Sequence, residues 1–125
     1  MLLSTVLIVE DDAVQRKLFA RQLRNIPCTV QMAEDGFQAL EVLRTTPVAL
    51  VLLDIYLPRM NGVEVLEAIR ANEQLSDVKV VIYTAGLLML TPDERTLADC
   101  VLRKPITAQE LEATIANLLP LTEPA

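Results

Sequence analysis

Short apolar runs alternate with segments of helical periodicity along this chain of 125 residues. A short, continuous apolar run bounded by turn residues is typical of a strand buried on both faces, whereas apolar residues three and four positions apart indicate an amphipathic helix. The pattern predicts five strands, over residues 5–9, 28–33, 48–53, 78–83 and 100–103. A stretch of helical period follows each of them, so the chain consists of five strand–helix units.

Capping residues mark where the predicted helices begin. The helix starts are assigned to Asp12, Asn61, Thr91 and Thr107, each followed three residues later by Gln or Glu, and to the turn at Asp35 and Gly36. The fourth helix is expected to be short, over residues 92–98. The apolar residues expected to face inward are Val14, Leu18 and Leu23, then Phe37, Leu40 and Leu43, then Val63, Leu66 and Ile69, and finally Leu111, Ile115 and Leu118. Arg16 and Lys17 are expected to face outward.

Five strand–helix units in succession predict an α/β fold, a doubly wound parallel sheet with helices on both faces. The strand order 2-1-3-4-5 is adopted from flavodoxin-like folds, in which it is common. No repeat or low-complexity stretch divides the chain. We therefore expect a single domain over residues 1–125, with a core of about 5–119.

Composition excludes several classes of function. The net charge of −6 disfavours direct binding of nucleic acid, which requires clustered cations. The chain has no histidine, which excludes histidine-based catalysis, histidine metal ligands and a phosphohistidine on this chain. No run approaches the roughly 18 apolar residues that a membrane span needs, so no membrane insertion is expected. Cys28 and Cys100 are interpreted as buried thiols in a reducing compartment, which favours a cytoplasmic protein.

Polar residues stand where four of the predicted strands end: Glu10 and Asp11, Asp54, Thr84 and Lys104. In the adopted strand order these ends lie side by side at the carboxyl edge of the sheet, where open α/β sheets place their chemistry. Three carboxylates at one edge repel each other and require compensation. We therefore expect a site at this edge.

A hard divalent cation would compensate these acids. Mg²⁺ prefers oxygen ligands, keeps several waters and binds through one or two carboxylates plus phosphate. Asp11 and Asp54 are predicted to bind Mg²⁺ directly, Glu10 to hold a metal-bound water, and the backbone carbonyl of Tyr56 to supply a further oxygen. With the charge of Lys104 and a hydroxyl at position 84, the set suits phosphoryl transfer onto Asp54.

The motifs VLIVEDD, AEDGFQAL, LVLLDIYLPRMNGVEVLEAIR, VVIYTA and RKPIT occur in this order between about residues 6 and 119. With them the chain resembles a response-regulator receiver domain of bacterial two-component signalling, similar to chemotaxis regulators. The resemblance implies that Asp54 is the phosphoacceptor, that Asp11 and Glu10 form the acidic metal pair, and that Thr84 and Lys104 contact the phosphoryl group. It also implies a cis peptide bond before Pro105.

The resemblance further implies a signalling protein rather than a classical enzyme, one that assists its own phosphorylation and dephosphorylation. The phosphoryl donor would be a sensor histidine kinase or a histidine phosphotransfer protein. A downstream protein or a second copy of the chain would bind through Leu87–Leu90 and the fourth helix. With no room for an output domain in 125 residues, the chain is expected to act by protein contact or as a relay, unless it is part of a longer protein.

Two positions depart from the family pattern. Val101 stands where family members usually carry an aromatic residue that couples the threonine to the output surface. The apolar segment Leu87–Leu90 either packs against a neighbouring helix or forms a partner surface. Tyr56 is bulky for its position, and its ring either shields an acyl phosphate from water or only lies on the surface.

Two alternative functions follow from these departures and from the acidic site. A degenerate receiver would bind partners without phosphorylation, which Val101 and the short fourth helix favour. An aspartate-nucleophile phosphatase of the haloacid dehalogenase type would need a second acid two residues after its nucleophile. The chain has Tyr56 there, and Glu10 and Asp11 come too early in the chain for that class.

Overall fold

A single five-stranded, all-parallel sheet of order β2-β1-β3-β4-β5 forms the centre of the molecule, as predicted. The computed structural model describes residues 3–86 and 90–119. The strands are β1 (Ser4–Val9), β2 (Cys28–Ala33), β3 (Leu50–Asp54), β4 (Lys79–Thr84) and β5 (Cys100–Arg103). The helices are α1 (Ala13–Gln22), α2 (Gly36–Thr45), α3 (Gly62–Ala71), the 3-10 turn η1 (Glu73–Leu75), α4 (Pro92–Leu97) and α5 (Ala108–Leu118).

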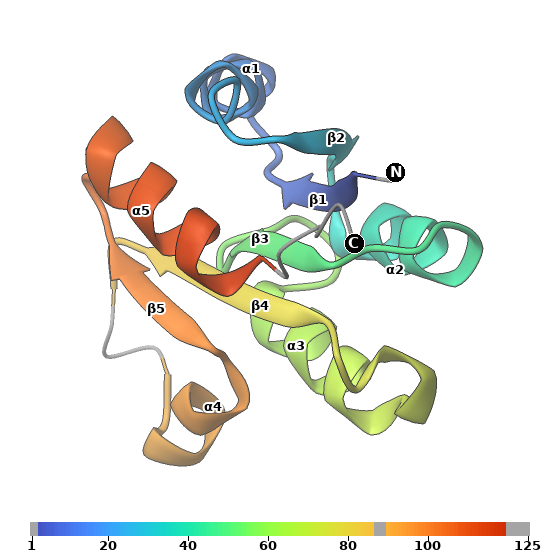
Figure 1. Cartoon of the computed structure of the whole chain (residues 1–125). Coiled ribbons are helices and arrows are strands. Elements are labelled where there is room, and N and C mark those ends of the chain that lie inside the picture. Colours follow the sequence, from blue (N-terminus) through green and yellow to red (C-terminus); the bar gives the residue numbers. More distant parts are fainter. Residues whose placement is uncertain (1–2, 87–89, 120–125) are drawn as a thin grey trace.

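Helices cover both faces of the sheet (Figure 1). The core between the sheet and α1 and α5 contains Phe19, Leu111 and Ile115. The core on the other face lies beneath α2 and α3, and Leu97 of α4 packs against it. The central strands are buried on both sides because helices cover both, which explains why they appear in the sequence as unbroken Val, Ile and Leu runs.

The register of the sheet brings the polar strand ends to one edge. Asp54, the last residue of β3, lies beside Tyr83 of β4, and Thr84 lies beside Arg103. Val9 lies beside Leu53, so Glu10 follows β1 at the level of Asp54. Parallel strands all point the same way, and the predicted site residues therefore share the carboxyl edge.

Local capping begins the helices at the predicted residues. Reciprocal capping boxes start α3 at Asn61 and α4 at Thr91. The side chains of Asp12 and Thr107 accept backbone N–H groups at the starts of α1 and α5. In the described structure the reciprocal partner of Asp12 is not Gln15: the N–H of Asp12 donates to Glu10 instead.

The predicted inward face of α1 was wrong. Val14 is 75% exposed and Leu18 is 42% exposed, whereas Phe19 is buried and Arg16 is half-buried. Of the predicted residues only Leu23 lies in the core. The helix is turned so that the Phe19 ring meets the edge of the Tyr83 ring, with the two centroids 4.9 Å apart. An aromatic pair of this geometry offers more buried area than the two aliphatic side chains it leaves outside.

Two further helix positions differ from the predictions. Phe37 at the start of α2 is 55% exposed, because Ala39 and Leu43 occupy the core-facing positions. Leu118, near the end of α5, is only half-buried, while Leu111 and Ile115 are buried as expected. In α3 the buried residues include Leu66 and Ile69, as the spacing predicted.

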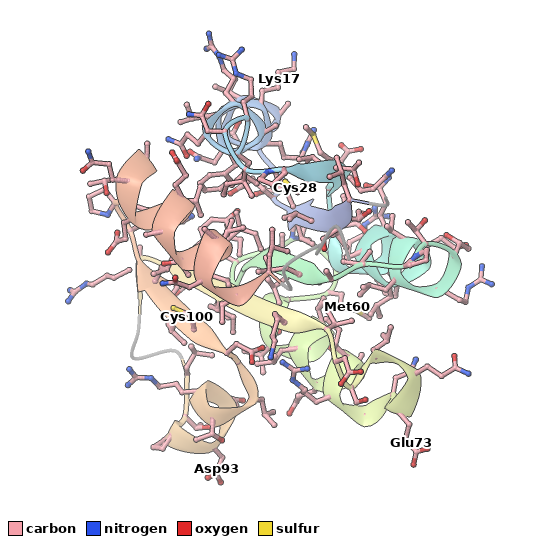
Figure 2. The ribbon with its side chains drawn as sticks, viewed as in Figure 1. Lys17, Cys28, Met60, Glu73, Asp93 and Cys100 are labelled. Atoms are coloured by element: carbon pink, nitrogen blue, oxygen red, sulfur yellow. The ribbon has the colours of Figure 1, made fainter. Side chains whose placement is uncertain are left out.

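The two cysteines are free thiols at opposite edges of the sheet. Cys28 lies on β2 and Cys100 on β5 (Figure 2), and both are half-buried rather than fully buried. Three strands separate them, so a disulfide between them is excluded by distance. Burial raises the pKa of both thiols, which keeps them protonated.

The region around α4 bears on the predicted partner surface. Leu90 is buried in the core beside α2 and α3, which makes it a packing residue rather than part of an exposed apolar surface. Leu87, Leu88 and Met89 lie outside the described residues. Helix α4 is short, as predicted, with only six residues. Among residues 3–86 and 90–119, no helix has the length and apolarity to cross a membrane.

Candidate functional site

Three carboxylates meet at the carboxyl edge of the sheet. Oxygen atoms of Glu10, Asp11 and Asp54 all lie within 4.8 Å of one another. Glu10 and Asp54 are buried, and Asp11 is exposed. The set offers only oxygen donors and opens to solvent at Asp11, which fits a cation that prefers oxygen ligands and keeps part of its water shell, as Mg²⁺ does.

Glu10 is held by contacts on every side. Its Oε1 accepts a hydrogen bond of 2.7 Å from the Tyr83 hydroxyl, and its Oε2 accepts one of 3.1 Å from the backbone N–H of Asp12. Its backbone carbonyl accepts a hydrogen bond of 2.7 Å from Arg16. Burial raises the pKa of the Glu10 carboxyl group, and the Tyr83 hydrogen bond partly offsets this effect.

Asp54 carries two donors on two different oxygens. Its Oδ1 accepts the backbone N–H of Tyr56 at 3.1 Å, and its Oδ2 lies 3.4 Å from the Lys104 ammonium nitrogen. Burial raises the pKa of the Asp54 carboxyl group, while the Tyr56 hydrogen bond and the Lys104 charge act in the opposite direction. Both donors lower the electrostatic cost of an ionised carboxylate in a nearly closed position.

Thr84 and Lys104 flank Asp54 from the neighbouring strands. Thr84 is fully buried at the end of β4, and its hydroxyl oxygen accepts the backbone N–H of Gly86 at 3.1 Å. The backbone N–H of Lys104 donates to the Thr84 carbonyl, which ties the end of β5 to the end of β4. The Lys104–Pro105 peptide bond is cis, as the resemblance implied.

The loop between β3 and α3 fixes the direction of Asp54. Gly62 packs against the backbone of Asp54 and Ile55, and its N–H donates to the Ile55 carbonyl at 2.8 Å. Within the same loop, Arg59 pairs with the buried Asp35, the N-cap of α2. The Tyr56 ring is 50% exposed and lies outside the core. The loop is therefore anchored at both ends while Tyr56 faces solvent.

Two contributors to this region were missed by sequence reasoning. Tyr83 was taken only as a strand residue, although a hydroxyl at a buried strand position requires a polar partner, and that requirement was an available signal. Arg59 adopts a φ of 66° and reaches Asp35. No local pattern announces that pair, because its two members are 24 residues apart.

Comparison with known proteins places these features in a family. The model of the response regulator receiver domain matches residues 6–116. Escherichia coli Regulator of RpoS is 36% identical over 101 residues, which cover 81% of this chain and 30% of that protein. The yeast Transcription factor SKN7 is 31% identical over 117 residues, which cover 91% of this chain and 18% of that protein. The chain thus spans less than a third of the length of these two curated relatives.

Solved structures agree with this assignment. The receiver domain of a LuxO repressor protein from Vibrio parahaemolyticus superposes with a TM-score of 0.86 at 30% identity, covering 93% of this chain and 89% of that one. The response regulator TrrA from Thermotoga maritima, solved in complex with Mg(2+)-BeF, gives 0.84 at 28% identity, covering 94% and 100% of the two chains.

The sheet order and the acidic strand edge define a flavodoxin-like α/β domain with a site compatible with Mg²⁺. More particularly, the chain belongs to the response regulator receiver domains, the signalling modules of two-component systems.

Proposed function

We propose that this domain accepts a phosphoryl group on Asp54 from a phosphohistidine of a sensor kinase or a histidine phosphotransfer protein. The observation that carries the proposal is the environment of Asp54. It is a nearly buried carboxylate with one donor on each oxygen, beside two further acids and a lysine. The phosphorylation of such a group is covalent catalysis of the aspartyl-phosphate type.

In the proposed reaction a carboxylate oxygen of Asp54 attacks the phosphorus in line with the leaving imidazole. An oxygen–phosphorus bond forms while the phosphorus–nitrogen bond breaks, and the electron pair of that bond returns to the imidazole nitrogen. Lys104 already lies 3.4 Å from Asp54 Oδ2 and would follow the charge onto the phosphoryl oxygens. We propose that the buried Thr84 hydroxyl donates a hydrogen bond to a phosphoryl oxygen of the product.

Mg²⁺ is the proposed cofactor. Asp11 and Asp54 would hold it, together with the Tyr56 carbonyl, and Glu10 would hold a metal-bound water. When bound, Mg²⁺ supplies positive charge that offsets the charge of the phosphoryl oxygens. The oxygen-only donor set supports this assignment, and the similar TrrA was solved in complex with Mg(2+)-BeF. The same residues would assist hydrolysis of the acyl phosphate, which makes the domain a timed switch.

The partners beyond the phosphoryl donor are also proposals. The exposed part of the α4 region is the proposed surface for a downstream protein or a second copy of the chain, now without the buried Leu90. We further propose that the domain works in the cytoplasm, where the half-buried free thiols Cys28 and Cys100 would stay reduced.

One alternative has a specific observation in its favour. Val101 is half-buried against the core beside α4 and has no ring to move when Thr84 closes on a phosphoryl group. A degenerate receiver that binds partners without phosphorylation would need no such movement. The alternative predicts that acetyl phosphate leaves the mass of the protein unchanged.

The deciding experiment is incubation with Mg²⁺ and acetyl phosphate, followed by intact-protein mass spectrometry. We expect the mass to rise by one phosphoryl group in the native chain and in Asp77→Asn, an exposed control outside the site. The Asp54→Asn variant should not gain it. Equal labelling of Asp54→Asn would place the phosphoryl group elsewhere and refute the proposal.

A further inference from the structure

Tyr83 is a single side chain that contacts both halves of the acidic site. It is fully buried in β4, directly before Thr84. Its hydroxyl donates to Glu10 Oε1 at 2.7 Å, and the Lys104 nitrogen lies 4.9 Å from the centroid of its ring. The ring itself is held edge-on by Phe19. Tyr83 therefore connects an acid on one side of Asp54 with the lysine on the other.

The contact with Glu10 determines how that carboxylate can be used. Because Tyr83 occupies Oε1 and the Asp12 N–H occupies Oε2, rotation of the carboxylate would break two hydrogen bonds at once. A buried carboxylate that loses such a donor incurs the cost of desolvation without compensation. Glu10 is thus held in one orientation, with two of its lone pairs already engaged. This arrangement suits acceptance of a hydrogen bond from a metal-bound water better than direct chelation.

The contact with Lys104 acts through the ring. An ammonium group over an aromatic face is attracted by the negative charge of that face, and the attraction grows where water is excluded. The Lys104 nitrogen is therefore placed by two groups, the Tyr83 ring and Asp54 Oδ2. Its side chain is 36% exposed, and without the ring it would have more freedom to turn into solvent.

We propose that Tyr83 is a positioning residue with two separable roles: its hydroxyl orients Glu10 for metal binding, and its ring places Lys104 for phosphoryl transfer. The inference rests on the proposed function of the site. Residues that orient metal-site groups from outside the ligand set typically change metal affinity by 10- to 100-fold when substituted. A residue that only fills the core would change stability and leave these two properties alone.

Two variants separate the two roles. Tyr83→Phe keeps the ring and removes the hydroxyl, and we expect Mg²⁺ to bind about tenfold more weakly by isothermal titration calorimetry. Its rate of labelling by acetyl phosphate at saturating Mg²⁺ should stay close to that of the native chain. Tyr83→Leu removes the ring as well, and we expect that saturated rate to fall further, by about tenfold.

Val81→Ala is the matched control. Val81 is also fully buried in β4 and packs in the same core cluster, but the described structure gives it no polar contact with the site. It should lower stability while leaving Mg²⁺ affinity and the saturated rate unchanged. Equal Mg²⁺ affinity of Tyr83→Phe and the native chain would overturn the inference, as would loss of affinity in Val81→Ala.

A measurement on the native chain covers the case in which a variant fails to fold. With tyrosine labelled by carbon-13 at Cζ, the Tyr83 resonance should shift in a saturable way as Mg²⁺ is added. A resonance that stays in place at saturating Mg²⁺ would overturn the inference, and so would a native chain that binds no Mg²⁺. These results are independent of the labelling of Asp54→Asn, which tests the proposed function alone.

Discussion

Gly62, the first residue of α3, packs on the backbone that carries Asp54. A methyl group on Gly62 would lie 2.6 Å from the Cα of Ile55, and closer still to the carbonyl oxygen of Asp54. Real side chains do not approach backbone atoms this closely, so the end of β3 and the start of α3 touch only because position 62 has no side chain.

We expect Gly62→Ala to lower the free energy of unfolding by about 2 kcal/mol, the usual cost of overpacking a closed site. Helix propensity alone would favour alanine by up to about 1 kcal/mol, so the sign of the change is diagnostic. Urea unfolding followed by circular dichroism measures it. Glu67→Ala, an exposed substitution in the same helix, should change stability by less than about 0.5 kcal/mol. A Gly62→Ala variant that is more stable than the native chain would contradict the close approach.

The metal site predicts stabilisation by Mg²⁺. A ligand at 100 times its dissociation constant stabilises the folded state by about 2.7 kcal/mol. We expect the melting temperature to rise with Mg²⁺ concentration in the native chain and in Asp77→Asn. The rise should be largely lost in Asp11→Asn, which removes the exposed acid of the cluster. An equal rise in all three proteins would show that Mg²⁺ acts elsewhere.

The pH dependence of stability follows from Asp54. Burial raises the pKa of its carboxyl group in the folded chain. Such a group stabilises the fold fully below its unfolded pKa of about 4, and this contribution is lost as the pH rises through the folded pKa. Without metal, Asp54→Asn should therefore be more stable than the native chain at pH 7, by roughly 1 kcal/mol.

The difference should vanish below about pH 4, where both the folded and the unfolded chain carry a protonated Asp54. Urea unfolding in buffer with a chelator, repeated from pH 3 to pH 8, tests this dependence. The exposed Asp77→Asn variant should follow the native curve throughout. A destabilised Asp54→Asn variant at pH 7 would mean that the Lys104 and Tyr56 contacts outweigh burial.

Tyr56 has a predicted role in the lifetime of the phosphorylated state. Its ring is 50% exposed beside the residue that would carry the phosphoryl group, so it is placed to restrict the approach of water. We expect Tyr56→Asn to shorten the half-life of the acyl phosphate severalfold, and Tyr56→Phe to preserve it. The decay of the phosphorylated mass after removal of acetyl phosphate measures both. An unchanged half-life in Tyr56→Asn would mean that the ring only lies on the surface.

Arg70 joins α3 to the ends of α4 and β4. Its guanidinium group donates to the carbonyls of Leu97 and Val78 and to the carboxylate of Asp99, each at 2.8 Å. Asp99 in turn accepts the backbone N–H of Val80. We expect Arg70→Met to lower the free energy of unfolding by about 2–3 kcal/mol, because three acceptors lose a charged donor.

Arg44→Met is the matched control, since Arg44 forms only an exposed pair with Glu41 on α2 and should matter by less than about 1 kcal/mol. Hydrogen exchange should also speed up around α4 in Arg70→Met and not in the control. Equal stability of the two variants would show that the Arg70 contacts contribute little.

Much of this fold follows from local signals. The apolar runs predicted the five strands to within two residues at their ends, and the caps at Asn61 and Thr91 began the helices where the structure has them. These features depend on neighbours close in the chain, as hydrogen bonds within a turn and alternation along a strand do. The sheet order came from a resemblance, and the register that aligns Asp54 with Tyr83 from the structure.

The sequence by itself determined which chemistry meets at the sheet edge, because acids and a lysine follow apolar runs that parallel strands bring side by side. Only the tertiary structure decided which face of α1 is buried, with Phe19 inside and Val14 outside. It also decided that Tyr83 links Glu10 to Lys104. Glu10 and Tyr83 are 73 residues apart. Contacts of that kind depend on how whole elements pack against each other, which no local pattern in the chain encodes.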